Sequence, residues 1–300
     1  MNAVADAELT MFIETLRDNP PPPAHLIGAD ALRTGQRQRV AAQPRGPELA
    51  DVCDERIGDV AVRIYRPQAA SQGTVVYVHG GMWVIGDLES HDRVCRRLAK
   101  ATGATVIAVD YRRAPENPWP AAVQDVLTVL RPVTASDGPV LVMGDSSGGN
   151  LAALACLRLR DDDSRLPDAQ VLAYPNTDLT LGRPSTCTKA TGWGLSTEDV
   201  AWGVELWVPD PQLRADPHVS PLFADVKGLP RAVVVTAEHD PLRDEGDAYA
   251  DRLRQVGVPT EHRCEAGLVH GFLTMDVVSP ACAAAGDRIF ADIAALLEES

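Results

Sequence analysis

Short runs of almost uninterrupted apolar residues follow one another along the chain from about residue 59 onward. They occupy residues 75–78, 106–109, 140–143, 171–173 and 233–235. A strand with one solvated face alternates polar and apolar residues, whereas runs like these are typical of strands that are buried on both faces. The pattern therefore predicts a parallel sheet that is covered by helices on either side.

Helix-like segments, in which apolar positions recur at intervals of three and four, alternate with these runs. They occupy residues 90–101, 119–131, 147–160, 245–256 and 281–298, and Ser90 is a candidate N-cap of the first. Strands and helices in this order predict an α/β fold with an open, mostly parallel sheet. A chain of 300 residues is expected to form one such domain rather than two.

Two regions depart from this rhythm. An amphipathic segment with Leu9, Phe12, Ile13 and Leu16 precedes a proline run at 20–23, which predicts a separate N-terminal helix. Residues 180–225 hold three tryptophans and many turn residues but little strand character. We expect this second region to form an insertion over the carboxyl edge of the sheet.

The composition narrows the classes of partner. A formal net charge of −14 argues against nucleic acid and anionic membrane surfaces, and makes a neutral substrate the default expectation. Six scattered cysteines form no Cys-x-x-Cys pair, so neither a metal site nor a dense disulfide framework is predicted. The N-terminus has no basic segment followed by an apolar one, and we therefore expect a cytoplasmic protein.

A candidate nucleophile lies between the run at 140–143 and the helix that follows it. Residues 144–148 read Gly-Asp-Ser-Ser-Gly, which fits Gly-x-Ser-x-Gly in the strand, sharp turn and helix that give this pattern its meaning. Glycine on either side allows strand and helix to approach closely around a strained serine. The alternative is a glycine-rich turn with a serine N-cap, which would require no partners elsewhere.

Serine needs a histidine base and a carboxylate that orients it, and both candidates are present. Asp240 follows the apolar stretch 232–236, where side chains reach the active edge of such a sheet. His270 lies between glycines in a loop before the last helix. The order serine, acid, histidine is the one that α/β-hydrolases use.

An oxyanion hole requires backbone N–H groups that face the tetrahedral intermediate. The strand at 75–78 ends in His-Gly-Gly, residues 79–81, where missing side chains would let the backbone face a substrate. We expect the N–H groups of Gly80, Gly81 and Ser147 to be the donors. His79 itself is expected to be a structural hydrogen-bonding residue.

Together these motifs resemble the hormone-sensitive lipase family, which includes many bacterial esterases. The resemblance covers about residues 60–275, with matches at 79–81, 110–116, 144–149, 219–222, 240–245 and 270–272. It implies that Ser146 is the nucleophile, Asp240 the acid and His270 the base. It also implies an eight-stranded sheet and a helical cap, drawn from about residues 1–50 and 180–215 within a single domain 1–300. No cofactor is implied, and a homodimer is plausible by analogy.

Two residues depart from the family pattern. Met82 stands where a third glycine is most frequent, and Ser147 stands where alanine is commonest. Only Ser146 is flanked correctly by glycines, so it remains the predicted nucleophile. We expect Met82 and Trp83 to line the substrate pocket.

Other residue assignments remain open at this stage. Asp244 could replace Asp240, and Asp145 is expected to point away from the nucleophile and to hydrogen-bond locally. The remaining candidate bases lie in no glycine-flanked loop after the acid and are expected to be surface or core residues; they are His91, His218, His239 and His262.

The leading functional hypothesis is hydrolysis of neutral short- to medium-chain carboxylic esters through an acyl-enzyme on Ser146. The same machinery could cleave an amide, such as an N-acetyl group on a small metabolite. A small-molecule receptor built on this fold is disfavoured, because serine, aspartate and histidine are all present. Interfacial lipolysis is also disfavoured, because the chain is acidic and no apolar anchor is apparent.

Overall fold

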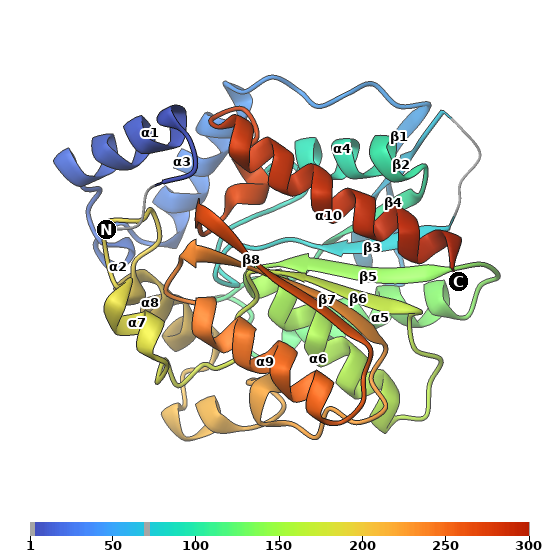
Figure 1. The fold of residues 1–300 in the computed structure, drawn as a ribbon. Coiled ribbons are helices and arrows are strands. Elements are labelled where there is room, and N and C mark those ends of the chain that lie inside the picture. The colour runs from blue at the N-terminus through green and yellow to red at the C-terminus, as the bar shows by residue number, and fades with distance from the viewer. Residues whose placement is uncertain (1–3, 69–72, 300) are drawn as a thin grey trace.

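Eight strands form one sheet in the computed structural model, which describes residues 4–68 and 73–299 (Figure 1). The strands are β1 (Asp51–Ile57), β2 (Val60–Arg66), β3 (Thr74–Val78), β4 (Thr105–Asp110), β5 (Val140–Asp145), β6 (Ala169–Ala173), β7 (Arg231–His239) and β8 (Thr260–Val269). Their order is β1-β2-β4-β3-β5-β6-β7-β8, in which β2 runs antiparallel to β1 and β4 and the other pairs are parallel. The predicted eight-stranded, mostly parallel sheet is thus confirmed, and the five apolar runs lie in β3 to β7.

Helices cover both faces of this sheet (Figure 1). One layer contains α4 (Asp92–Thr102) and α10 (Pro280–Glu298), and the other contains α5 (Ala121–Thr134), α6 (Ser147–Asp161) and α9 (Arg243–Gln255). Successive side chains of β5 enter opposite layers: Val142 packs in the α5, α6 and α9 core, and Leu141 packs in the α4 and α10 core. Both are fully buried, which stabilises the fold by about 1.5–3 kcal/mol for each such side chain.

The start of α4 differs from the sequence expectation. The helix begins at Asp92 and is preceded by His91, which makes no side-chain cap. Ser90 instead accepts a hydrogen bond from the Asp87 N–H through its Oγ, at 2.8 Å. It therefore closes the turn before the helix rather than capping the helix itself.

The remaining helices gather at the edge of the sheet where β7 and β8 end (Figure 1). They are α1 (Ala7–Asp18), α2 (Ala24–Ile27), α3 (Ala29–Ala41), α7 (Pro184–Thr188) and α8 (Thr197–Trp207), with short 3-10 helices at Pro211–Ala215, Pro221–Phe223 and Phe272–Thr274. Residues 1–3 of the expected cap segment lie outside the described residues. Among the described helices, none is both long and apolar enough to cross a membrane.

Hydrogen bonds join the N-terminal helices to the insertion. The Arg17 side chain donates from Nε to the Gly192 carbonyl at 2.9 Å, and the Ala24 N–H donates to the Asp199 carboxylate at 2.7 Å. Two segments that are about 175 residues apart in the chain therefore form one layer over the carboxyl edge of the sheet.

Candidate active site

Ser146 occupies a sharp turn between β5 and α6. Its φ is 53° and its ψ is −122°, a left-handed conformation that is strained for a residue with a side chain. The turn packs closely against β3, and this requires glycine at position 148, because a Cβ there would collide with the Val78 carbonyl oxygen. The Ser146 N–H donates to the Ala173 carbonyl at 2.9 Å, which fixes the turn at the carboxyl edge of the sheet.

The structure brings Ser146, His270 and Asp240 together. His270 Nε2 lies 2.9 Å from Ser146 Oγ, and His270 Nδ1 lies 2.7 Å from Asp240 Oδ2. Asp240 directly follows β7 and His270 directly follows β8, so the ends of three parallel strands supply the three side chains. The arrangement is a hydroxyl–imidazole–carboxylate relay in which the imidazole can accept the serine proton.

The Asp240 carboxylate is held on both oxygens. It is fully buried, and its Oδ1 accepts the Leu242 N–H at 2.8 Å while Oδ2 faces His270. The Tyr174 ring and the imidazole pack in an edge-to-face arrangement, with centroids 4.8 Å apart. No sequence motif marks Tyr174 as a neighbour of the base, because the contact joins the end of β6 to a loop almost a hundred residues later.

The expectation that the Gly80 N–H is an oxyanion donor is wrong. The Gly80 N–H donates to Asp145 Oδ1 at 3.0 Å and therefore faces away from a substrate. The missing side chain makes room for the carboxylate, since a Cβ on Gly80 would lie 2.5 Å from Asp145 Oδ2. Within residues 4–68 and 73–299, the N–H groups of Gly81, Met82 and Ser147 donate no hydrogen bond. Gly81 and Met82 both line the pocket beside Ser146.

Asp145 anchors the loop that carries these amides. Its Oδ1 accepts from the Tyr77 hydroxyl at 2.8 Å as well as from Gly80, and His91 Nε2 lies 3.5 Å away. Burial raises the pKa of Asp145, but the nearby His91 and the Tyr77 hydrogen bond outweigh it, so that this pKa lies below its usual value. The carboxylate is therefore an ionised, locally bonded anchor, and it makes no hydrogen bond to Ser146 among the described contacts.

Replacing Asp145 tests this anchoring role. We expect Asp145→Ala to lower kcat by about 10- to 100-fold with little change in KM, because amides that face the developing oxyanion act in the transition state. Asp145→Asn keeps an oxygen for the Gly80 N–H and should retain more activity. Steady-state kinetics on a p-nitrophenyl ester measure both parameters, and equal kcat values for the two variants would exclude the anchoring role.

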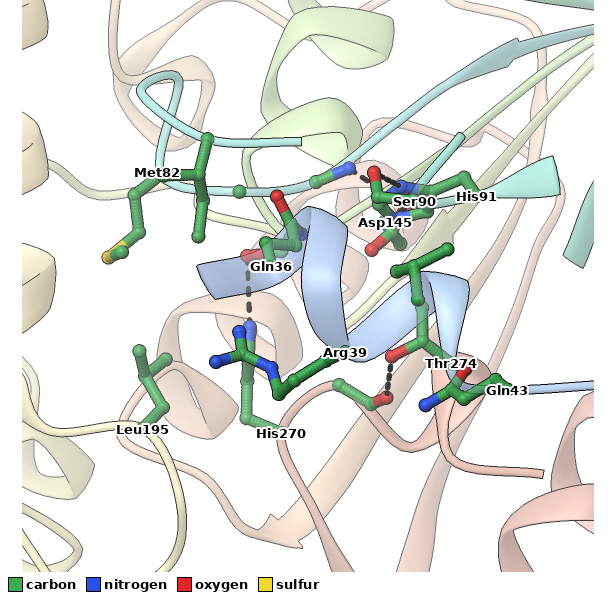
Figure 2. A pocket seen from close by; sticks show the side chains of 16 residues that line it. Gln36, Arg39, Gln43, Met82, Ser90, His91, Asp145, Leu195, His270 and Thr274 are labelled. Atoms are coloured by element: carbon green, nitrogen blue, oxygen red, sulfur yellow. Dashed lines mark hydrogen bonds and ion pairs between the residues drawn. The ribbon is translucent and has the colours of Figure 1, made fainter. Parts of the chain in front are cut away.

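A pocket of about 280 Å³ has Ser146 and His270 in its lining, and Figure 2 shows the side chains that line it. Met82 lines it, as expected, and Leu195 of the insertion lies on its wall. Trp83 does not line it, contrary to expectation. Its ring is fully buried and stacks on Trp207 with centroids 4.4 Å apart, so that it joins the core to α8.

Helix α3 supplies a side of this pocket that the sequence did not reveal. Its pocket-lining residues are Gln36, Arg39 and Val40, followed by Gln43 just beyond the helix (Figure 2). They are spaced by three, one and three positions and therefore share one face of the helix. That periodicity is visible in the sequence, but nothing in it indicates what the face covers.

The other histidines and Asp244 have structural partners. Burial lowers the pKa of His79 to about 3, so this ring is uncharged and stacks on Tyr111 with centroids 4.2 Å apart. Asp244 Oδ2 accepts the Ser185 N–H at 2.8 Å and is not bonded to His270 in the described contacts. Partners also lie near the remaining rings: Asp216 at 2.9 Å from His218, Lys189 at 3.1 Å from His239 and Asp247 at 2.9 Å from His262.

The chain is similar in sequence and in structure to known proteins. A family described by the alpha/beta hydrolase fold matches residues 75–274. Carboxylic ester hydrolase LipN of Mycobacterium tuberculosis is 37% identical over 287 residues, covering 89% of this chain and 76% of the relative. An arylesterase of Saccharolobus solfataricus is 40% identical over 227 residues, covering 72% and 73%. A hyperthermophilic esterase of Pyrobaculum calidifontis superposes with a TM-score of 0.87 at 34% identity, covering 98% of this chain and 99% of that one.

Proposed function

This chain belongs to the α/β-hydrolase family, as its resemblance to the hormone-sensitive lipase family predicts, and we propose that it hydrolyses small carboxylic esters through an acyl-enzyme on Ser146. The observation that carries the proposal is the relay itself: Ser146 Oγ lies 2.9 Å from an imidazole whose other nitrogen lies 2.7 Å from a buried carboxylate. Relatives named as ester hydrolases over most of the chain support the reaction class.

Acylation begins when Ser146 Oγ attacks the ester carbonyl carbon while His270 Nε2 takes its proton. Asp240 stabilises the imidazolium that forms and holds His270 in the required orientation. We assign the oxyanion contacts to the N–H groups of Gly81, Met82 and Ser147, because these amides donate no hydrogen bond among the described residues. Gly81 and Met82 line the pocket with Ser146, and Ser147 directly follows the nucleophile. The intermediate then expels the alcohol, whose oxygen takes the proton from His270.

Deacylation repeats the same steps with water. His270 Nε2 accepts a proton from a water molecule as the water oxygen attacks the acyl carbon. Collapse of the second intermediate returns the proton to Ser146 Oγ and releases the carboxylic acid. The chain's own residues thus supply every proton transfer.

The size of the pocket supports short- to medium-chain esters as general substrates, and the net charge of −14 favours neutral ones. The pocket volume of about 280 Å³ lies just below the range of about 300–1,000 Å³ that is typical of small-molecule sites. We propose that α1 to α3, α7 and α8 form a cap over it within a single domain. Leu195 and α3 line the pocket from this side, which supports that assignment.

Labelling with diethyl p-nitrophenyl phosphate tests the nucleophile. This reagent phosphorylates a serine that is activated by a histidine base, so we expect one phosphoryl group per chain on the peptide that contains Ser146. Hydrolysis of p-nitrophenyl butyrate should be lost in proportion to labelling, as measured by mass spectrometry and by rate. Activity that survives complete labelling of Ser146, or is lost with label only on another residue, would exclude the proposal.

A further inference from the structure

Arg39 brings an unpaired positive charge to the active-site pocket, and we propose that its guanidinium binds a carboxylate group on the substrate. The inference rests on the proposed esterase function and extends its substrate class beyond neutral esters. Arg39 lines the same pocket as Ser146 and His270, and its side chain runs back along α3, so that its Nη1 lies 3.9 Å from the place that a Cβ on Gly35 would take (Figure 2).

The missing partner of Arg39 distinguishes it from nearby arginines. Arg33 lies 2.7 Å from Glu116, Arg37 lies 3.3 Å from Asp87 and Arg45 lies 3.6 Å from Asp92. In the part of the chain that the structure describes, no carboxylate lies within ion-pair distance of Arg39. Each of these three arginines therefore has a carboxylate partner, and Arg39 differs from them in having none among the described residues.

The rest of the pocket wall favours an anion over a second cation. Asp145 is the one carboxylate among the described lining residues, and its Oδ1 is already engaged by Tyr77 and Gly80. Gln36 Oε1 accepts the Gly86 N–H at 2.9 Å, which leaves the Gln36 amide nitrogen as a donor. Gln36 and Arg39 lie three positions apart on the same face of α3 and together present N–H groups. A carboxylate accepts such groups through both of its oxygens.

Charge compensation also affects the reaction. His270 becomes an imidazolium during acylation, and a free cation in the same pocket disfavours that state. A substrate carboxylate that pairs with Arg39 removes this penalty as the transition state forms. The positive charge of Arg39 also offsets the repulsion that a chain with a net charge of −14 exerts on an anionic ester.

Two substrate classes share this chemistry. The carboxylate can lie on the acyl side, as in a half-ester of a dicarboxylic acid, or on the alcohol side, as in an acylated hydroxy acid. Monoethyl glutarate and its carboxamide analogue test the first class. Acetylated gamma-hydroxybutyrate and its carboxamide test the second, and in each pair the two compounds differ in charge but hardly in shape.

The measured quantity is the ratio of kcat/KM for the carboxylate to that for its carboxamide, obtained by titrating the released acid at constant neutral pH. We expect Arg39→Gln to lower this ratio about tenfold for one of the pairs, because a charge-assisted hydrogen bond is lost. Arg39→Lys should retain part of the preference. Added salt should reduce the preference of the unmodified protein, since an exposed pair is screened.

Arg37→Gln is the matched control, because Arg37 lies on the same helix, pairs with Asp87 and does not line the pocket. We expect its ratio to equal that of the unmodified protein. Equal ratios in the unmodified protein and in Arg39→Gln, for both pairs, would overturn the inference while leaving ester hydrolysis intact. Failure of the proposed function itself is distinguishable, because none of the four esters would then be hydrolysed.

Discussion

Ser146→Ala is expected to lower kcat for p-nitrophenyl butyrate by at least about 10⁴-fold, whereas Ser147→Ala should keep most of the activity. Ser146 Oγ lies 2.9 Å from His270 Nε2 and has only a small exposed fraction, 6%, at the floor of the pocket. Removing this hydroxyl removes the atom that forms the acyl bond. The remaining rate would come from the amides and the binding surface alone.

Ser147→Ala is the control because it tests the neighbouring hydroxyl without changing the backbone. Ser147 is fully buried, and its Oγ has no hydrogen-bond partner among the described residues. The variant retains the N–H that we assign to the oxyanion. A buried hydroxyl without a hydrogen-bond partner destabilises the folded state by about 1–3 kcal/mol. Removing it should therefore not lower the thermal unfolding temperature of the Ser147→Ala variant. A larger loss of kcat in Ser147→Ala than in Ser146→Ala would reverse the assignment of the nucleophile.

The parts of the fold that were predictable are those in which burial dominates the sequence pattern. Strands β3 to β7 are covered on both faces and consist of apolar runs, so they were found without a structure. The edge strands β1 and β8 expose many of their side chains and leave no such run. Only the family resemblance supplied the count of eight strands.

The site shows the same division. Ser146, Asp240 and His270 each follow a strand end, and parallel strands bring their carboxyl ends to one edge, so their meeting could be anticipated from the sequence. The exclusion of the Gly80 N–H from the oxyanion hole could not be anticipated, because this N–H donates to Asp145, 65 residues later in the chain. Arg39 was missed for a related reason: the packing of α3 over the pocket is set by contacts between distant segments.

Asp240→Asn is expected to lower kcat by about 10⁴-fold at neutral pH while leaving the fold intact. The Leu242 N–H requires an oxygen at the Oδ1 position, where it now donates at 2.8 Å. An asparagine that keeps this bond must place its NH₂ group toward His270 Nδ1, where Asp240 Oδ2 now lies at 2.7 Å. The imidazole then carries its proton on Nε2 and cannot accept one from Ser146.

Asp244→Asn is the matched control for this change, because Asp244 is the other carboxylate that the sequence offered as the acid. It bonds to the Ser185 N–H at 2.8 Å and pairs with Arg243 at 2.7 Å, so it acts on the junction of α7 and α9. We expect kcat of Asp244→Asn to stay within about threefold, since asparagine keeps an oxygen for the Ser185 N–H and Asp244 makes no hydrogen bond to His270 among the described contacts. Kinetics on both variants, with circular dichroism to verify folding, decide between the two carboxylates: a loss confined to Asp244→Asn would make Asp244 the orienting acid.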